Sequence, residues 1–436
     1  MNGEEKIGYK QILRQKEYMK TIIAALINRL GDSIDGIALT WLVYQITQSA
    51  AWSAIIFGVN RIPTIFLQPF AGAAIEGKNK KQIMIVTDII RGLCVGFVAT
   101  AFLFGFLNQW WLLGATFIIS SAEAFRGPAS AALLPKLLDK KYYSFGLSLS
   151  ASVCNVMELV GLGVAGLIIS LFSVTTAIYI DMITFFLSAL IIVSLRVQEN
   201  NLSKARIDAK EYLSSLKGGF SYLKDNAVLR YFVLLAVFLN AILVPLNSLQ
   251  APLISEVLKV NEVMLSVLGV AITLGMIFGS GIYPYLSSKL GKRGIASISA
   301  FSIGGYYLLF VISGSFFTSE AMIYILVSVS SFIVGAAVAL LSTFCNVEFV
   351  RNIQGEYMAR VTALFSACGV AAIPVVSFLV SILAGFTPTV VLFLIAGILD
   401  ILVSIFLCRK KRFAAMEQEE TEDITGGEEF EDITAG

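Results

Sequence analysis

The sequence predicts an all-α integral membrane protein in which twelve transmembrane helices form two six-helix halves. Three observations lead to this fold class. The 436 residues are 57% hydrophobic and only 14% charged, with a mean hydropathy of +0.81, whereas soluble domains carry about 25% charged residues. Twelve apolar runs are long enough to cross about 30 Å of hydrocarbon. The loops between these runs alternate between basic and nearly uncharged.

The twelve expected spans account for most of the chain. Hydrophobic runs place them at 18–46, 51–75, 83–107, 110–133, 144–171, 174–195, 228–255, 263–288, 295–315, 320–347, 360–384 and 388–408. Basic residues concentrate in both terminal segments and in every second loop, whereas the alternate loops together contain one lysine, Lys259. By the positive-inside rule, this pattern predicts a multi-pass protein of the plasma membrane with both termini in the cytoplasm.

The longest loop predicts where the chain divides. Residues 1–195 are expected to form the first six-helix half and residues 228–413 the second, with a binding site between the halves near the middle of the membrane. The linker at 196–227 contains a basic helix with an apolar stripe, which either lies along the membrane surface or tethers the halves. Nine acidic and no basic residues follow Phe413, so the tail at 414–436 is expected to be disordered.

The first span carries polar residues in its interior. Asn28, Asp32 and Asp35 follow at spacings of four and three, so they share one face of a helix, and Arg29 lies beside them. A charge near the centre of a bilayer costs at least about 2.5–3.5 kcal/mol on insertion scales, and it persists where it faces protein, water or substrate. The polar stripe therefore predicts a transporter rather than a membrane anchor.

Further charges lie inside the later spans. They are Arg61, Glu123, Arg126, Glu158, Asp181 and Asp400. Glu158 is expected at a depth similar to that of Asp32, and these two carboxylates form a candidate proton site. The alternative is a lattice of buried charges that fixes helix register, in which an arginine pairs with Glu158. Glu123 and Arg126 are three residues apart and are expected to pair with each other. The candidates for proton coupling or substrate contact are Asn28, Arg29, Asp32, Asp35, Arg61, Glu123, Arg126 and Glu158.

The loop after span 2 resembles a family motif. It reads Gly72-Ala-Ala-Ile-Glu76-Gly-Lys78-Asn-Lys80-Lys81, and Asp88 and Arg91 follow in span 3. It is similar to the loop between helices 2 and 3 of the major facilitator superfamily, Gly-x-x-x-Asp-Arg-x-Gly-Arg-Arg, although Glu76 replaces the Asp and the first Arg and second Gly are missing. The resemblance implies the major facilitator fold. It also implies that Glu76 contacts the start of helix 11 and helps to close the cytoplasmic side, with Arg91 or Lys81 as the partner of Asp88.

Span 1 carries a narrower resemblance. Its segment Leu30-Gly-Asp32-Ser-Ile-Asp35-Gly-Ile-Ala-Leu-Thr-Trp-Leu-Val-Tyr44 is similar to helix 1 of the branch that includes macrolide-efflux proteins and enterobactin exporters. The similarity covers essentially the whole chain except the acidic tail, and it implies export of a molecule of the drug, macrolide or siderophore type. Asp35 is not part of the branch pattern, so we expect it to be specific to the substrate of this protein.

Span 5 contains a set of closely spaced glycines, Gly161, Gly163 and Gly166. Small residues at these spacings let two helices approach closely. Proton antiporters of the superfamily carry a Gly-Pro-rich motif at this place, but Leu162 stands where the proline is expected. The glycines therefore indicate either antiport or a generic packing face.

The composition excludes several classes of function. The chain contains no histidine, and its five cysteines show neither a CxxC motif nor a pairing pattern. No phosphate-binding loop or nucleophile constellation is present. We therefore expect no enzyme activity, no metal, no cofactor and no nucleic acid partner. We expect a monomer that contacts membrane lipids, a small-molecule substrate and protons.

These features predict a secondary active transporter that exports a hydrophobic or amphipathic small molecule by proton antiport, working by alternating access. Import of a nutrient or siderophore is an alternative, because a fold does not set the direction of transport. A lipid flippase and a non-transporting sensor or scaffold are further alternatives. The second half is poor in embedded charge, and its aromatic residues are expected either to line the substrate path or to pack the core. They are Phe238, Tyr283, Tyr306, Tyr307 and Phe344.

Overall fold

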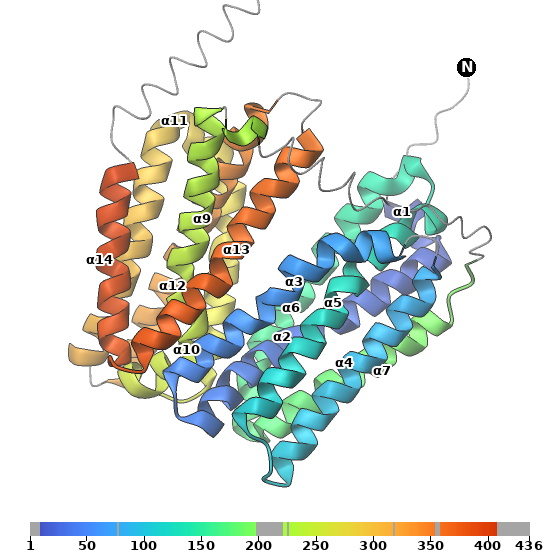
Figure 1. The fold of residues 1–436 in the computed structure, drawn as a ribbon, viewed down its shortest axis with the longest axis horizontal. Helices are drawn as coiled ribbons and strands as arrows, with labels where there is room; N and C mark the ends of the chain where they lie inside the picture. Colours follow the sequence, from blue (N-terminus) through green and yellow to red (C-terminus); the bar gives the residue numbers. More distant parts are fainter. Residues whose placement is uncertain are drawn as a thin grey trace, which may run out of the picture. The chain divides into compact units, whose positions relative to one another are not determined.

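The computed structural model describes residues 9–75, 78–197, 221–224, 226–316, 319–353 and 358–407. Within these ranges the regular structure is entirely helical (Figure 1). The helices of the first half are α1 (Tyr9–Leu13), α2 (Lys16–Thr47), α3 (Ala50–Ile75), α4 (Lys80–Leu103), α5 (Gln109–Leu137), the 3₁₀ turn η1 (Lys140–Tyr142), α6 (Tyr143–Leu171) and α7 (Val174–Val193). Those that follow are α9 (Ala227–Ser248), α10 (Gln250–Pro252), the π-helical turn η2 (Leu253–Leu258), α11 (Val263–Phe316), α12 (Glu320–Arg351), α13 (Met358–Ala384) and α14 (Thr389–Leu407).

The helices confirm the predicted number of spans. Nine helices in the described ranges are long and apolar enough to cross a membrane. One of them, α11, covers two predicted spans, and its helical backbone is interrupted at Gly291, where φ is +66°. The helices α2 and α5 complete the predicted set of twelve. Both carry the intramembrane charges that distinguish them from a plain hydrophobic span.

Polar caps set where several helices begin. Asn108 Oδ1 accepts hydrogen bonds from the N–H groups of Trp110 (3.0 Å) and Trp111 (3.1 Å) at the start of α5. Ser173 Oγ accepts one from the N–H of Thr176 at 3.0 Å at the start of α7. Such caps satisfy backbone donors that have no partner inside the helix. Short polar loops therefore suffice to separate long apolar helices.

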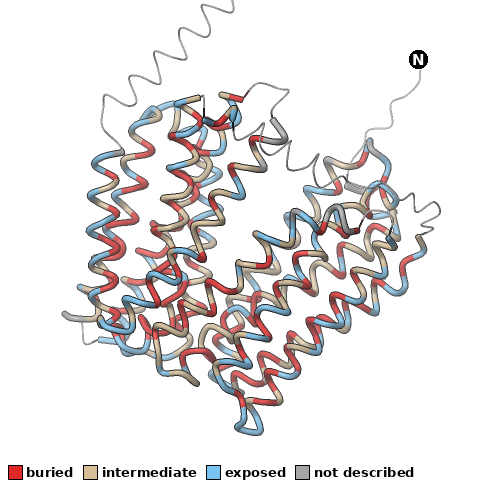
Figure 2. Tube along the Cα trace, in the orientation of Figure 1, coloured by how far each residue is buried: buried red, intermediate tan, exposed pale blue. Residues whose placement is uncertain are grey.

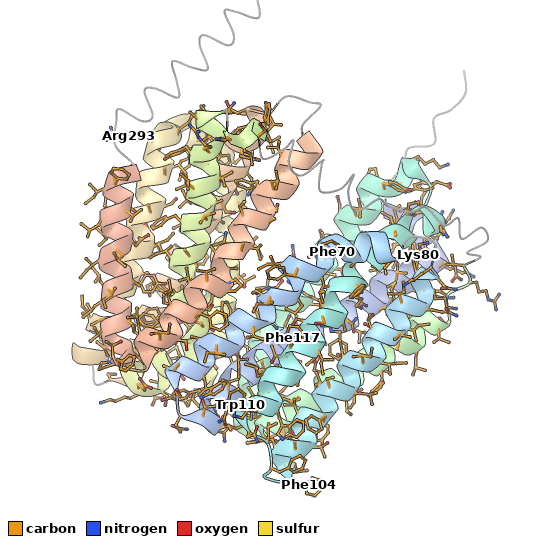
Figure 3. The ribbon with its side chains drawn as sticks, viewed as in Figure 1. Phe70, Lys80, Phe104, Trp110, Phe117 and Arg293 are labelled. Carbon is orange, nitrogen blue, oxygen red and sulfur yellow. The ribbon has the colours of Figure 1, made fainter. Side chains whose placement is uncertain are left out.

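The two ends of α4 differ in character. Lys80 begins the helix and Phe104 follows its last residue, and Figure 3 shows the two side chains at opposite ends. Phe104 is 74% exposed, and Trp110 at the start of the next helix is 64% exposed. Lysines at one end and exposed aromatic rings at the other are typical of helices that cross a bilayer, where aromatic residues favour the interface.

The chain divides into two compact units. The first comprises Met1–Ser214, Val244–Val270 and Val370–Thr389, and the second comprises Ser215–Leu243, Ala271–Gly369 and Val390–Gly436. The first unit thus includes, besides the first six spans, the end of α9, the start of α11 and the second part of α13. Residues 198–220 of the predicted linker and the predicted disordered tail at 414–436 lie outside the described residues, so the domain boundaries proposed from the sequence stay predictions.

In the first unit, α2 packs against both α6 and α7, while α4 packs against α5 and α7. Buried and exposed residues alternate along these helices (Figure 2). Glycines allow the closest approaches. A Cβ atom at Gly31 would lie 2.0 Å from Thr184 Oγ1, and one at Gly161 would lie 2.8 Å from the carbonyl oxygen of Leu30. The helix that carries the polar stripe is therefore held by helices on more than one side.

In the second unit, α11 and α12 touch through their backbones. A Cβ atom at Gly275 would lie 2.1 Å from the carbonyl oxygen of Phe332, and one at Gly335 would lie 2.1 Å from that of Ile272. Small residues at such crossings permit the van der Waals packing that holds helices together in lipid. No other residue fits these positions without a shift of backbone.

The aromatic residues of the second half pack within this unit. Tyr307 is fully buried and its hydroxyl donates to the carbonyl oxygen of Ile242, while Tyr306 bonds to Ser331 Oγ at 2.6 Å. Phe344 is 1% exposed and packs edge-on against Phe232. For Tyr306, Tyr307 and Phe344 the structure supports core packing, because each ring is buried. Tyr283 is also buried, whereas Phe238 is only half-buried.

Replacing Gly335 with alanine is expected to destabilise the folded chain by about 1–3 kcal/mol, because the added methyl group has to displace the backbone of α11. The thermal unfolding midpoint of the purified chain in detergent measures this cost. Gly305 in α11 is the matched control, since a Cβ atom there would meet nothing within 4 Å. Equal losses for the Gly335→Ala and Gly305→Ala variants would contradict the assignment of this contact.

Candidate functional site

A ladder of charges joins α4 and α5. Asp88 and Arg91 are three residues apart on α4, and Glu123 and Arg126 are three residues apart on α5. Arg91 Nη1 lies 2.6 Å from Glu123 Oε2, and Arg126 Nε pairs with Asp88 Oδ1. The expected pairing of Glu123 with Arg126 is therefore wrong, as is the expected pairing of Asp88 with Arg91 or Lys81. Each carboxylate therefore pairs with the arginine of the neighbouring helix and not with the arginine of its own helix.

Arg91 extends the ladder to α2. Its Nη2 lies 2.7 Å from Asp32 Oδ1, and the guanidinium carbon lies 4.2 Å from the centre of the Phe185 ring on α7. The Arg91 side chain is 6% exposed. The planar guanidinium can serve two carboxylates and an aromatic face at once, which a lysine could not do. Asp32 thus shares the Arg91 cation with Glu123.

The other end of the ladder is closed by neutral side chains. Asp88 is fully buried and accepts a hydrogen bond from Ser188 Oγ at 2.7 Å. The amide of Asn28 lies against the same pair, and with its oxygen turned toward the donors it accepts from Arg126 Nη2 at 2.5 Å. Asn28, predicted from the sequence as a site residue, therefore helps to hold the Asp88–Arg126 pair.

Glu158 belongs to a separate pair. Arg29 Nη2 lies 2.5 Å from Glu158 Oε2, and the two side chains are 45% and 29% exposed. This contact links α2 to α6 on a face different from that of the ladder. Arg29 neutralises Glu158, so the structure gives Glu158 the environment that the sequence reading described as a charge lattice.

Two carboxyl groups near the ladder have no cation. Asp35 is 8% exposed, and its Oδ1 has no hydrogen-bond partner among the described residues. Asp181 on α7 is 1% exposed and accepts one hydrogen bond, from Thr184 Oγ1 at 3.1 Å. The two carboxyl groups interact with each other electrostatically, and both also sense Asp32 and Arg91. Neither forms an ion pair within the part of the chain that the structure describes.

The charges of this region do not balance. Its carboxyl groups are Asp32, Asp35, Asp88, Glu123, Glu158 and Asp181, and its cations are Arg29, Arg61, Arg91 and Arg126. Arg61 lies over the Phe57 ring at 5.9 Å and has no carboxylate partner in the described ranges. Burying an unpaired carboxylate is costly, so a proton is the simplest way to neutralise Asp35 and Asp181. The sequence identified Asp181 as an intramembrane charge, but only the packing of α7 on α2 brings it to Asp35.

A cavity of about 210 Å³ adjoins the stripe on α2. It is lined by Gly36, Leu39, Thr40, Val43, Ser53, Ile56, Phe57, Asn60, Thr116, Asn247 and Ser248. These residues come from α2, α3, α5 and the end of α9, all within the first unit. Gly36 and Leu39 follow Asp32 and Asp35 by four residues, so the cavity lies one helical turn, about 6 Å, beyond the carboxyl groups. Sequence reasoning missed this cavity, whose only signal was uncharged polar residues inside apolar spans.

Residues 21–372 match the sequence model of the Major Facilitator Superfamily. The chain belongs to this superfamily. Among curated proteins it is similar to macrolide efflux protein A of Streptococcus pyogenes, with 22% identity over 87% of this chain and 92% of that protein. It is also similar to the multidrug efflux pump Tap of Mycobacterium tuberculosis (strain CDC 1551 / Oshkosh), with 21% identity over 80% of this chain and 83% of the pump.

Solved structures show the same fold. The nucleoside transporter NupG superposes with a TM-score of 0.71 at 14% identity, over 90% of this chain and 98% of that one. A bacterial homologue of the iron transporter ferroportin superposes with a TM-score of 0.64 at 15% identity, over 91% and 99% of the two chains. Together with the match to the superfamily model and the efflux relatives, this makes the chain a multi-pass transporter of small molecules in the cell membrane and not an enzyme.

The predicted gating residues of this facilitator do not form one cluster among the described residues. Asp88 and Arg91 lie in the ladder, Gly72 lies in α3, Lys80 begins α4, and Glu76 lies outside the described residues. Lys81 Nζ donates to the carbonyl oxygen of Leu195 at 2.8 Å, just beyond the end of α7. A cation there is favourable because helix ends carry unpaired carbonyl groups. The gating role proposed for Glu76 stays a prediction.

Lys20 also binds the carboxyl end of α7. Lys20 Nζ donates to the carbonyl oxygen of Ser194 at 2.9 Å and pairs with Glu17. The backbone N–H of Arg196 and the Lys20 ammonium hold the pKa of Glu17 below its usual range. These contacts tie the start of α2 to the end of α7 in the facilitator's first unit.

The glycines of span 5 lie on α6. Gly161 faces Ser33 and Leu30 of α2 closely, and the N–H of Gly166 donates to Ser266 Oγ at 2.6 Å. A Cβ atom at Gly163 would meet Val270 at 3.7 Å, an ordinary contact. Two of the three predicted packing glycines thus lie at close helix contacts, and whether they also serve antiport stays a prediction.

Proposed function

We propose that this transporter exports a hydrophobic or amphipathic small molecule in exchange for protons, working by alternating access with both termini in the cytoplasm. Two observations support the proposal. The related proteins include a macrolide efflux protein and a multidrug efflux pump. The observation that carries it is Asp35, a buried carboxyl group without a cation among the described residues, which directly precedes the cavity-lining Gly36 on α2.

The ion pairs of the carboxyl groups support a choice among them for this role. The sequence points to Asp32, Asp35 and Glu158, but Arg91 pairs with Asp32 and Arg29 pairs with Glu158. An adjacent arginine stabilises the ionised carboxylate and so opposes protonation. Asp35 forms no ion pair among the described residues and lies next to the cavity-lining Gly36, so we take it as the candidate proton carrier of α2. Asp32 and Arg91 are the other charges that influence it.

In the proposed cycle a proton from outside neutralises Asp35 before the outer side closes. A neutral α2 face is cheaper to enclose in lipid than a charged one. Loss of the proton to the cytoplasm then restores the charge while the cavity accepts substrate. Because Asp35 and the cavity-lining residues Gly36 and Leu39 lie within one turn of α2, protonation and substrate binding act on the same helix.

The test is proton movement driven by substrate. Inverted membrane vesicles that hold an inwardly acidic pH gradient receive a panel of uncharged and cationic amphiphiles, and a pH-sensitive dye reports the gradient. Export by antiport predicts that some of these compounds collapse the gradient in vesicles with the protein and not in empty ones. A transporter that accumulates the same compounds only in right-side-out vesicles would instead be an importer.

A hydrogen-bonded carboxylate at the far end of α2 suggests how the outer side closes. Glu256 in η2 accepts from Tyr44 Oη at 2.8 Å and from Thr389 Oγ1 at 2.5 Å. All three residues belong to the first unit. Bonds to an ionised acceptor are stronger than neutral ones, so Glu256 holds α2, η2 and the start of α14 together.

Replacing Glu256 with alanine is therefore expected to favour opening to the outside. The measurement is labelling of a Thr40→Cys cavity variant by an impermeant maleimide added outside whole cells, with the five native cysteines replaced by serine. Labelling should become several times faster with Glu256→Ala. Glu262→Ala is the control, because this neighbouring acid makes no such contacts in the described structure. Unchanged labelling with Glu256→Ala would argue against the closing role.

A further inference from the structure

The cavity beside α2 is polar but uncharged. Its hydrogen-bonding side chains are Thr40, Ser53, Asn60, Thr116, Asn247 and Ser248. The lining contains no Asp, Glu, Lys or Arg among the described residues. The remaining lining is aliphatic or aromatic, with Leu39, Ile56 and Phe57 among it. Its chemistry therefore differs from that of the charged ladder one turn away.

Several of these polar side chains are uncommitted. Ser248 is 3% exposed, yet its Oγ has no hydrogen-bond partner among the described residues. The side chains of Asn60, Thr116 and Asn247 likewise make no hydrogen bond to any described residue. Thr40, by contrast, is satisfied by the carbonyl oxygen of Gly36 at 2.7 Å. Two carboxamides and the Thr116 hydroxyl thus offer both donors and acceptors to whatever enters the cavity, whereas the Ser248 Oγ is enclosed by protein.

Polar groups that line a cavity without a protein partner can bond to a ligand that enters it. Among them Thr116 is buried, Asn60 is half-buried and Asn247 is exposed. Neutral donors and acceptors match hydroxyl, ether and carbonyl groups. They offer no counter-charge to a cation, and Arg61, next to Asn60 in the chain, adds a positive charge on α3. The aromatic and aliphatic lining matches the apolar part of the same molecule.

We propose that this cavity binds the uncharged, hydroxyl- or carbonyl-bearing part of the transported molecule. The proposal rests on the proposed function, whose substrate class it narrows from amphipathic molecules in general to uncharged ones. Asn60, Asn247 and Thr116 bind the polar groups, and Phe57 packs against the apolar part. Substrate binding in the cavity then affects Asp35 through the α2 helix that carries both, and no charge on the substrate is needed.

Gly36 offers a direct steric test. It lines the cavity, and a Cβ atom at this position would meet nothing within 4 Å. A leucine at position 36 therefore fits the helix and fills the cavity without displacing backbone. Gly114 on α5 is the matched control, because a Cβ atom there also meets nothing within 4 Å and the residue does not line the cavity.

The experiment measures equilibrium binding of radiolabelled probes to the purified full-length chain in detergent. Chloramphenicol and uridine are the uncharged, hydroxyl-bearing probes, and tetraphenylphosphonium is the cationic one. We expect at least one uncharged probe to bind more tightly than tetraphenylphosphonium. Gly36→Leu should weaken its binding at least tenfold, while Gly114→Leu should leave the Kd unchanged. Size-exclusion profiles and thermal midpoints confirm that both variants are folded.

A second pair of variants tests the polar groups separately from cavity volume. Asn247→Leu should weaken the binding of the uncharged probe at least tenfold, and Asn346→Leu should not. Asn346 on α12 is the control because it lies outside the cavity and donates within its own helix, to Ser342, at 2.8 Å.

Two results would overturn the proposal. One is tighter binding of tetraphenylphosphonium than of both uncharged probes, and the other is equal weakening by a cavity variant and its control. Binding is measured at constant pH without a gradient, so it does not depend on proton coupling. A chain that binds an uncharged probe in the cavity but moves no protons would refute the proposed antiport and leave the cavity assignment intact.

Discussion

Replacing Asp35 with asparagine is expected to reduce proton-driven efflux to background while preserving substrate binding and downhill exchange. Asparagine keeps the size of the side chain and imitates the protonated acid, but it cannot release a proton. Asp35 has no cation among the described residues, so its neutral form leaves no partner unpaired. The variant should therefore fold normally and still alternate, because the step that it loses is the return of charge to the face of α2.

The measurement compares two transport modes in proteoliposomes. Efflux driven by a pH gradient should disappear in Asp35→Asn, whereas exchange of labelled for unlabelled substrate without a gradient should continue. Glu158→Gln is the matched comparison, since that carboxylate already pairs with Arg29 at 2.5 Å. Loss of coupling in Glu158→Gln with full coupling in Asp35→Asn would move the proton site to α6 and contradict our ranking of the carboxyl groups.

Much of the fold could be predicted because it depends on local pattern. A bilayer requires long apolar runs, and basic residues mark the ends of those runs, so the twelve spans follow from counting along the chain. Gly291 illustrates the limit of that counting. The hydrophobic pattern places two spans around it, but only the structure shows that the turn between them is as short as the non-helical backbone of this one glycine, with φ +66° and ψ 172°.

The pairing of charges could not be predicted in the same way. Glu123 and Arg126 are the correct distance apart to pair within α5, and local spacing is all that a single sequence offers. Their true partners, Arg91 and Asp88, lie on α4, more than thirty residues away in the chain. The choice depends on which helix faces which.

The cavity could not be predicted from the sequence either, because it also depends on which helices face each other. It combines uncharged polar residues of four helices, each of which looks ordinary in its own span. Asn60 and Thr116 line one cavity only because α3 packs against α5. Ser248 joins them because the end of α9 belongs to the same unit. Charged residues are conspicuous inside a membrane because they are costly, whereas hydroxyls and amides are not. The sequence therefore directs attention to the coupling groups before the substrate groups.

Replacing Arg91 with methionine is expected to cause the largest loss of stability of any single change to the ladder, about 3–5 kcal/mol. Removing the guanidinium leaves Asp32 and Glu123 without their shared cation and removes the contact with the Phe185 ring. Methionine fills a similar volume, so the loss reports the charges rather than a void. The thermal midpoint of the purified chain, read with chemical denaturation, measures the effect.

Arg29→Met is the matched control. It removes one partner of a single ion pair whose arginine is 45% exposed, compared with 6% for Arg91, so it should cost much less. Adding Asp32→Asn and Glu123→Gln to Arg91→Met should restore most of the stability, because no buried carboxylate is then left unpaired. If Arg29→Met costs as much as Arg91→Met, or if the triple variant is no more stable than Arg91→Met alone, the ladder does not hold α2, α4 and α5 together through its charges.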